Sequence, residues 1–233
     1  MERETLKTNL NRVQLRMAEA ARRAGREPAE VTLIAVTKTV DAQTTQTLIE
    51  LGVRDIAENR QQTAAEKLPH VQALAGPNRP TLHFIGPLQR NKVKRIIEQF
   101  DVIHSVDSVK LAAEISKRAV ELQRTAGVFV QVNVAGEEQK GGLEPGELRD
   151  SLKEILRLPN LHLWGLMCMA PYDDNPETAR PHFKRLAALS REMIEGSSMP
   201  AGANRLSMGM SGDFEVAIEE GATHVRIGSA LYE

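Results

Sequence analysis

The hydrophobic positions of the chain form one helical stripe, followed by a regular alternation of short apolar runs and helical segments. Apolar residues recur at intervals of three and four from Leu6 to Ala24, which predicts an amphipathic helix that ends near Gly25. Eight runs rich in strand-forming residues then follow in order: VTLIAVTK (31–38), VRDIAEN (53–59), LHFIGPL (82–88), DVIHSVDS (101–108), GVFVQVN (127–133), LHLWGLMCM (161–169), RLSMGM (205–210) and THVRIG (223–228). We interpret these runs as strands.

Segments with helical spacing follow each of the first seven predicted strands, for example over 109–124, 144–158 and 177–195. Strands that alternate with helices indicate βαβ units and a parallel sheet. Eight such units in 233 residues predict an α/β fold, a single (β/α)8 TIM-type barrel domain over residues 1–233 with an additional N-terminal helix. An open doubly wound sheet is the alternative, although no G-x-G-x-x-G follows the first strand. Residues 69–81 hold three prolines and one glycine, which predicts a loop.

Composition narrows the classes of function mainly by exclusion. Lys+Arg number 30 and Asp+Glu 31, and only 3% of residues are aromatic, which argues against nucleic acid as a partner. The single Cys168 excludes an intramolecular disulfide, and no cluster of spaced metal ligands is present, so we expect no metal site. No run approaches the roughly 18 apolar residues of a membrane span, and the N-terminus has no apolar signal region. We therefore expect a cytoplasmic protein with no membrane contact. We also expect the protein to be a monomer.

In a barrel of this type the active site lies at the C-terminal ends of the strands, where Lys38 ends the most apolar run. A lysine at a strand end can simply extend its charged head into water. The alternative is an ε-amine inside the barrel opening, where low dielectric lowers its pKa and leaves it nucleophilic. Such an amine suits a Schiff base with an aldehyde.

Two consecutive loops have the composition of a phosphate site. The segment SMGMSGD (207–213) leaves the seventh predicted strand and opens a helix, for which Ser211 is the candidate N-cap. Gly228 and Ser229 leave the eighth strand. Either loop alone also fits ordinary turn chemistry. Together they occupy the position at which (β/α)8 barrels most often bind phosphate.

Two strand residues carry less specific signals. Arg226 faces a buried environment and needs a partner, which is either an acid such as Glu219 or Glu220 or an atom of a bound ligand. His83 is expected to be a hydrogen-bonded strand histidine, with a ligand role as the alternative.

Longer motifs carry a resemblance to a known family. They are AVTKTV (35–40), AEN (57–59), HFIGPLQRNK (83–92), HSVD (104–107), QVNVAGEEQKGG (131–142), GLMCMAP (165–171) and LSMGMSGDFEVAIEEGATHVRIGSALY (206–232). Over essentially its whole length the chain resembles the pyridoxal phosphate homeostasis proteins, stand-alone relatives of the alanine racemase N-terminal barrel. The family usually continues with a Gly-x-Arg element where this chain reads Tyr232-Glu233 and stops. We therefore expect an incomplete last helix, which leaves closure of the barrel open.

The resemblance implies a pyridoxal 5′-phosphate (PLP) cofactor bound covalently to Lys38. It implies phosphate contacts from Ser207, Ser211, Gly228 and Ser229, and it implies that Arg226 faces the pyridine nitrogen. Asn59, His83 and Met208 match residues that line the cofactor pocket. No residue is assigned a catalytic role.

The implied function is intracellular homeostasis of PLP, a form of vitamin B6, with apo PLP-dependent enzymes as candidate acceptors. A PLP-dependent amino-acid racemase is the alternative. Racemisation needs a second acid/base opposite the lysine, and the chain has only two tyrosines, Tyr172 and Tyr232, of which Tyr172 is the one to consider. A barrel that binds phosphosugars without a cofactor is a third hypothesis, and it would not need Lys38.

Overall fold

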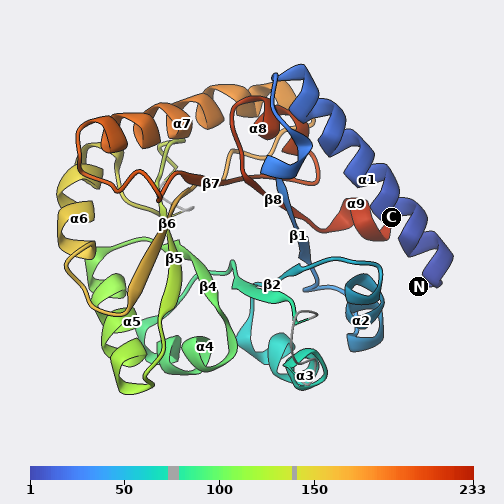
Figure 1. The fold of residues 1–233 in the computed structure, drawn as a ribbon, viewed down its shortest axis with the longest axis horizontal. Helices are drawn as coiled ribbons and strands as arrows, with labels where there is room; N and C mark the ends of the chain where they lie inside the picture. Colours follow the sequence, from blue (N-terminus) through green and yellow to red (C-terminus); the bar gives the residue numbers. More distant parts are fainter. Residues whose placement is uncertain (73–78, 138–140) are drawn as a thin grey trace.

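Eight parallel strands form a closed barrel in sequence order, with the helices around its outside (Figure 1). The computed structural model describes residues 1–72, 79–137 and 141–233. The strands are β1 (Thr32–Val36), β2 (Asp55–Glu58), β3 (Thr81–Phe84), β4 (Val102–Val106), β5 (Ala126–Gln131), β6 (Leu161–Met167), β7 (Arg205–Met210) and β8 (His224–Ile227). The helices are α1 (Arg3–Arg23), α2 (Ala42–Glu50), α3 (Gln61–Gln72), α4 (Val93–Gln99), α5 (Val109–Glu121), α6 (Leu148–Ile155), α7 (Arg180–Glu195), α8 (Phe214–Glu219) and α9 (Ser229–Tyr232). The predicted (β/α)8 class is confirmed.

The barrel is closed by pairing between the first and last strands. Thr32 lies opposite His224 and Ala35 lies opposite Ile227, so β1 and β8 are in register over four residue pairs. This pairing excludes the open doubly wound sheet. The last helix, α9, is only four residues long, but the ring of strands is complete. The barrel is therefore closed without a longer final helix. Helix α1 packs along α8 and α9, which brings the two chain ends to the same side of the barrel (Figure 1).

Side chains alternate between the barrel interior and the layer of helices, as the period of two requires. On β1, Ala35 belongs to the large apolar cluster shared with the helices, whereas Ile34 and Val36 form a separate small cluster with Ala57 of β2. A second small cluster holds Val102, Phe129 and Met167. The rest of the interior includes buried polar side chains, namely His83, His104, Ser207, His224 and Arg226.

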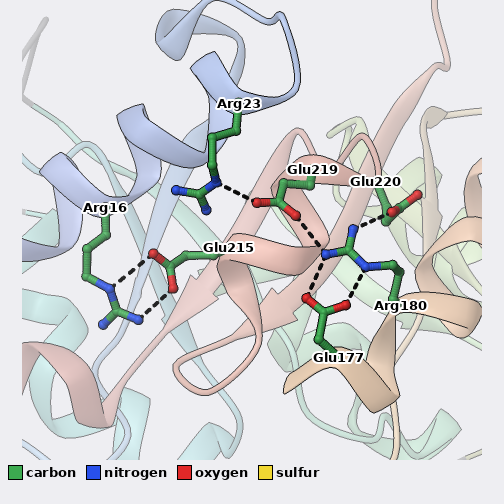
Figure 2. Close-up of polar contacts among 7 residues, drawn as sticks. All are labelled: Arg16, Arg23, Glu177, Arg180, Glu215, Glu219 and Glu220. Atoms are coloured by element: carbon green, nitrogen blue, oxygen red, sulfur yellow. Dashed lines mark hydrogen bonds and ion pairs between the residues drawn. The ribbon is translucent and has the colours of Figure 1, made fainter. Parts of the chain in front are cut away.

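Ion pairs fasten α1 and α7 to α8 (Figure 2). The pairs that join these helices are Arg16–Glu215, Arg23–Glu219, Arg180–Glu219 and Arg180–Glu220, and Arg180 also pairs with Glu177 just before α7. Arg180 donates hydrogen bonds to the three surrounding carboxylates, and these bonds raise its pKa. Because several charges share partners in one network, this contact is stronger than isolated surface pairs would be.

The prediction for residues 69–81 is partly wrong. Helix α3 continues to Gln72 and includes Pro69, so residues 69–72 are helical. Residues 73–78 of that predicted loop lie outside the described residues, as do 138–140 of the QVNVAGEEQKGG motif. Within the part of the chain that is described, no helix has the length and apolar character needed to cross a membrane.

Candidate functional site

Five of the nine predicted site residues lie at the end of the barrel formed by the C-terminal ends of the strands. The register of β1 with β2 pairs Val36 with Ala57, so Lys38 and Asn59, each two residues further on, lie at the same level of the barrel. Gly228 lies beside the end of β1, because a Cβ on this glycine would be 3.6 Å from the Cβ of Val36. We call this end of the barrel the mouth and define it by Lys38, Asn59, Ser211, Gly228 and Ser229.

Lys38 lies in the turn that follows β1. Ile34 and Val36 face the barrel interior, and Lys38 is the next position of that alternation, two residues beyond the end of β1. Its side chain is exposed, which differs from the low-dielectric environment considered for it. Within the described residues its amine makes no hydrogen bond and no ion pair. Lys38 is therefore accessible at the mouth and not committed to another group.

The structure shows a buried ion pair next to Lys38 that the sequence analysis did not predict. The Nζ of Lys67 donates to Glu58 Oε1 at 3.0 Å and to the carbonyl of Thr37 at 2.6 Å. The Thr37 hydroxyl donates to the same Glu58 oxygen at 2.7 Å. These bonds join α3 to the backbone directly before Lys38. The sequence feature that could have indicated this ion pair is the charged Glu58 near the end of the apolar run VRDIAEN (53–59).

Asn59 is half-buried at the end of β2, and Gly86 lies directly against its backbone. A Cβ at position 86 would overlap the carbonyl oxygen of Asn59, so only glycine allows this approach. The Ser105 hydroxyl donates to the Gly86 carbonyl at 2.6 Å. Together these contacts fix the ends of β2 and β3 at the mouth.

Ser211 joins the two loops that the sequence analysis singled out. Its Oγ accepts hydrogen bonds from the N–H of Gly228 at 3.1 Å and from the N–H of Ala230 at 3.3 Å. The prediction that Ser211 caps the following helix is wrong, because Asp213 occupies the N-cap of α8. Ser229 is exposed next to these two N–H groups. Two backbone donors thus converge on one oxygen atom at the mouth.

β7 runs to Met210, as the run RLSMGM (205–210) predicts, so Ser207 and Met208 do not belong to the loop that the segment SMGMSGD (207–213) suggested. Ser207 is therefore a strand residue and not a loop residue, and its hydroxyl is fully buried in the barrel interior. Met208 is fully buried in the large apolar cluster shared with the helices. Its side chain does not line the mouth, which leaves only its backbone for a role there.

Arg226 is almost fully buried and has no carboxylate in ion-pair contact among the described residues. It donates to Ser207 Oγ at 2.7 Å and to the Cys168 carbonyl at 3.0 Å. Glu219 and Glu220, the partners considered from the sequence, instead bind Arg180. Burial lowers the pKa of Arg226, and the nearby charge of Asp213 acts weakly in the opposite direction.

His83 lies below the mouth in the barrel interior, with no exposed surface. Its Nε2 is 2.9 Å from Asp55 Oδ1, and its Nδ1 is 2.8 Å from Nε2 of His104. The Nδ1 of His104 is in turn 2.8 Å from Ser207 Oγ. His83 is thus hydrogen-bonded on both ring nitrogens, as one of the two sequence interpretations expected, and it does not reach the mouth directly.

Acid should destabilise the fold through two buried histidines. Burial lowers the pKa of His224 to about 3 and that of His104 well below its ordinary value of 6.5. The unfolded chain takes up these protons below about pH 6.5, so the stabilisation is complete above that pH and is lost as the pH falls toward 3. Each histidine contributes at most about 1.4 kcal/mol per pH unit.

The measurement is the free energy of unfolding by denaturant at several pH values. His224→Gln should flatten its fall below about pH 6.5, whereas the control His162→Gln, at an exposed position, should leave it unchanged. An identical pH dependence in wild type and His224→Gln would contradict this origin of acid lability.

Comparisons with known proteins find similarity along nearly the whole chain. The family model of the alanine racemase N-terminal domain matches residues 8–233. A pyridoxal phosphate homeostasis protein of Aquifex aeolicus is 42% identical over 223 residues, which covers 96% of this chain and 95% of the relative. The protein of the same name from Escherichia coli K12 is 37% identical over 229 residues, with coverage of 96% and 94%. These names assign no reaction.

Solved structures share the architecture. PipY from Synechococcus elongatus PCC7942, solved with PLP bound, is 33% identical with a TM-score of 0.81, and the match covers 93% of this chain and 100% of PipY. An alanine racemase of Clostridium difficile is 17% identical with a TM-score of 0.73, over 98% of this chain and 56% of the racemase. At that identity the second likeness shows a common barrel fold only.

Proposed function

This chain belongs to the pyridoxal phosphate homeostasis protein family, and from that membership we propose that it binds PLP at the mouth, holds it through Lys38 and passes it on without turning over amino acids at an enzyme's rate. The observation that carries the proposal is a convergence at one end of the barrel. Among the described residues, an amine without a partner, two backbone donors gathered on one oxygen, and a buried guanidinium without a carboxylate contact lie on or just after the adjacent strands β7, β8 and β1. These are the three kinds of group that an aldehyde, a phosphate and a pyridine nitrogen require.

Lys38 supplies the covalent bond. Its neutral amine attacks the aldehyde carbon of PLP, a C=N bond forms, and the aldehyde oxygen leaves as water. Exposure at the mouth favours reversal, because another amine can reach the same carbon and displace Lys38. The buried contacts among Thr37, Glu58 and Lys67 support this role by fixing the backbone that carries the lysine.

The phosphate is proposed to bind through dipoles and hydroxyls, with no cationic clamp. The N–H groups of Gly228 and Ala230 already converge on Ser211 Oγ, which shows that the backbone points both donors at a single acceptor. A phosphate oxygen fits that acceptor position, and the Ser211 and Ser229 hydroxyls are then available as further donors. Ser207 is not part of this set, because its hydroxyl is bonded in the barrel interior.

Arg226 is proposed to face the pyridine nitrogen of the cofactor. A guanidinium carries five N–H donors, and protein partners accept from Arg226 at two positions in the described structure. A donor of this kind hydrogen-bonds the ring nitrogen without transferring a proton to it, which weakens the ring as an electron sink. Asn59 would flank the ring from the end of β2. His83 would act through Arg226 and without contacting the cofactor.

The proposal extends to partners and organisation. We propose that residues 1–233 act as one PLP-binding domain, that the working form is a monomer, and that apo PLP-dependent enzymes receive the cofactor. The closed ring of strands supports one site in each chain.

The phosphate contacts can be tested by comparing PLP with unphosphorylated pyridoxal. Titration followed by the absorbance of the Schiff base should show that pyridoxal binds much more weakly than PLP, because only PLP offers an anion to the Gly228 and Ala230 donors. Ser211→Ala should weaken PLP binding by about 1.5–3 kcal/mol, the range for a hydrogen bond to a charged group.

Ser198→Ala is the control for this titration, since its hydroxyl accepts from Arg149 and takes no part in the hydrogen bonds of Ser211 with Gly228 and Ala230. Equal affinities for pyridoxal and PLP in the wild-type protein would show that the phosphate site is wrongly placed.

A further inference from the structure

A continuous series of polar contacts crosses the barrel interior and ends at Arg226. It begins at Asp55 on β2 and passes through His83 on β3, His104 on β4 and Ser207 on β7. The four contacts measure 2.9, 2.8, 2.8 and 2.7 Å. The side chains of His83, His104 and Ser207 are fully buried, so water does not compete for their hydrogen-bonding atoms.

The residues at the two ends of this series determine the direction in which its hydrogen bonds are donated. Arginine can only donate and an ionised carboxylate can only accept. Since Arg226 donates to Ser207 Oγ, the single hydroxyl proton is left to donate to Nδ1 of His104. At the other end the ionised Asp55 requires Nε2–H on His83.

The middle contact completes the pattern. A neutral His104 that accepts at Nδ1 carries its proton on Nε2, and it donates that proton to Nδ1 of a neutral His83. Every hydrogen bond then runs from Arg226 toward Asp55, and each ring nitrogen has a partner. A protonated His83 would reverse the tautomer of His104, but it would place a second cation inside the barrel that already holds buried Arg226.

We propose that Asp55, His83 and His104 are positioning residues that set the orientation of Arg226 toward the cofactor through the Ser207 hydroxyl. The proposal rests on the proposed PLP site. Without these contacts the Ser207 hydroxyl can rotate and donate its proton elsewhere. Its oxygen then no longer offers the Arg226 guanidinium an acceptor at a fixed position. Asp55 anchors the far end beside a cavity of about 450 Å³ at the opposite end of β1 and β2, lined in part by Thr32 and Arg54.

The first test uses the protein without cofactor. Long-range ¹H–¹⁵N correlation spectra of the ¹⁵N-labelled full chain at about pH 8, well above the ordinary histidine pKa, report the tautomer of each ring. The expected result is a neutral ring with the proton on Nε2 for both His83 and His104. A proton on Nδ1 of either ring, or on both nitrogens of His83, would overturn the direction.

The second test reads the ring nitrogen of PLP labelled there with ¹⁵N and bound to the full chain. His104→Phe cuts the series, so the ¹⁵N resonance should move and the Kd for PLP should rise about tenfold, as for one lost charge-assisted hydrogen bond. His104→Gln should restore both values, because glutamine can accept from Ser207 and donate to His83. Asp55→Asn, at a partly exposed side chain, should move the resonance in the same direction as His104→Phe.

His224→Phe is the matched control, since His224 is buried in the same interior but bonds Thr223 and not the series. A resonance that moves equally in His224→Phe and His104→Phe, or in neither, would overturn the positioning role. Failure of the wild-type chain to bind PLP at all would instead overturn the proposed function, and the tautomers of the cofactor-free protein would still decide the direction of the series.

Discussion

Lys38→Ala should abolish the covalent adduct between the protein and PLP. Borohydride reduces a Schiff base to a stable secondary amine, so the wild-type chain should carry one trapped pyridoxyl group, located by peptide mapping. Within the part of the chain that is described, the amine of Lys38 is accessible at the mouth and makes no hydrogen bond or ion pair, and alanine leaves no nitrogen at this position to form the C=N bond. The expected effect is complete loss of the adduct.

Two further variants separate the covalent bond from charge. Lys38→Arg keeps the positive charge but forms no Schiff base, so it should also lose the adduct. Lys92→Ala, which changes a lysine after β3 at the same end of the barrel, should keep the adduct in full. An adduct trapped on a different lysine in the wild-type protein would refute the assignment.

The loaded protein should transfer its cofactor to an apo PLP enzyme but should not racemise or decarboxylate amino acids. A general acid/base typically contributes about 10²–10⁴-fold in rate, and a racemase needs one on the face opposite the lysine. The two tyrosines are poorly suited to this role. The Tyr172 hydroxyl is exposed and donates to Asp174 at 3.2 Å. The Tyr232 hydroxyl donates to the Val36 carbonyl at 3.0 Å, and burial raises its pKa.

The measurement is incubation of the loaded protein with L-amino acids in deuterated water, followed by analysis of α-proton exchange and chirality. In parallel, recovery of activity by an apo PLP enzyme reports transfer, with the Lys38→Ala variant as the control. Turnover near the enzyme median of about 10 s⁻¹ would overturn the carrier function. Absence of transfer to any acceptor would contradict delivery and leave storage of the cofactor.

The periodicity of the sequence was sufficient to predict the barrel, for a physical reason. Each strand must present one face to the helices and the other to the interior, so its apolar pattern is set locally and can be read locally. Closure by β1 and β8 was harder to predict, because it joins residues such as Thr32 and His224 that are far apart in the chain.

The site was predicted less completely, because its contacts depend on register and on distant partners. Ser207 belongs both to the predicted strand 205–210 and to the segment 207–213 that was interpreted as a phosphate loop, and the local sequence does not decide between them. The pairing of Met210 with Arg226 shows that β7 continues and holds Ser207 in the interior. The contact between His104 and Ser207 spans 103 positions, so no spacing rule reveals it. The accessible position of Lys38 likewise depends on how neighbouring strands end.

The pairing of β1 with β8 also bears on when during synthesis the protein can first bind its ligand. Lys38 is synthesised well before Arg226, Gly228 and Ala230, which come much later in the chain. At about 5–20 residues per second, roughly 10–40 s of translation separates the lysine from these partners. During that interval β1 has no β8 to pair with, and the nascent chain can offer an incoming cofactor only an isolated amine. Cofactor loading is therefore expected to follow the synthesis of β8 and not to guide the earlier steps of folding.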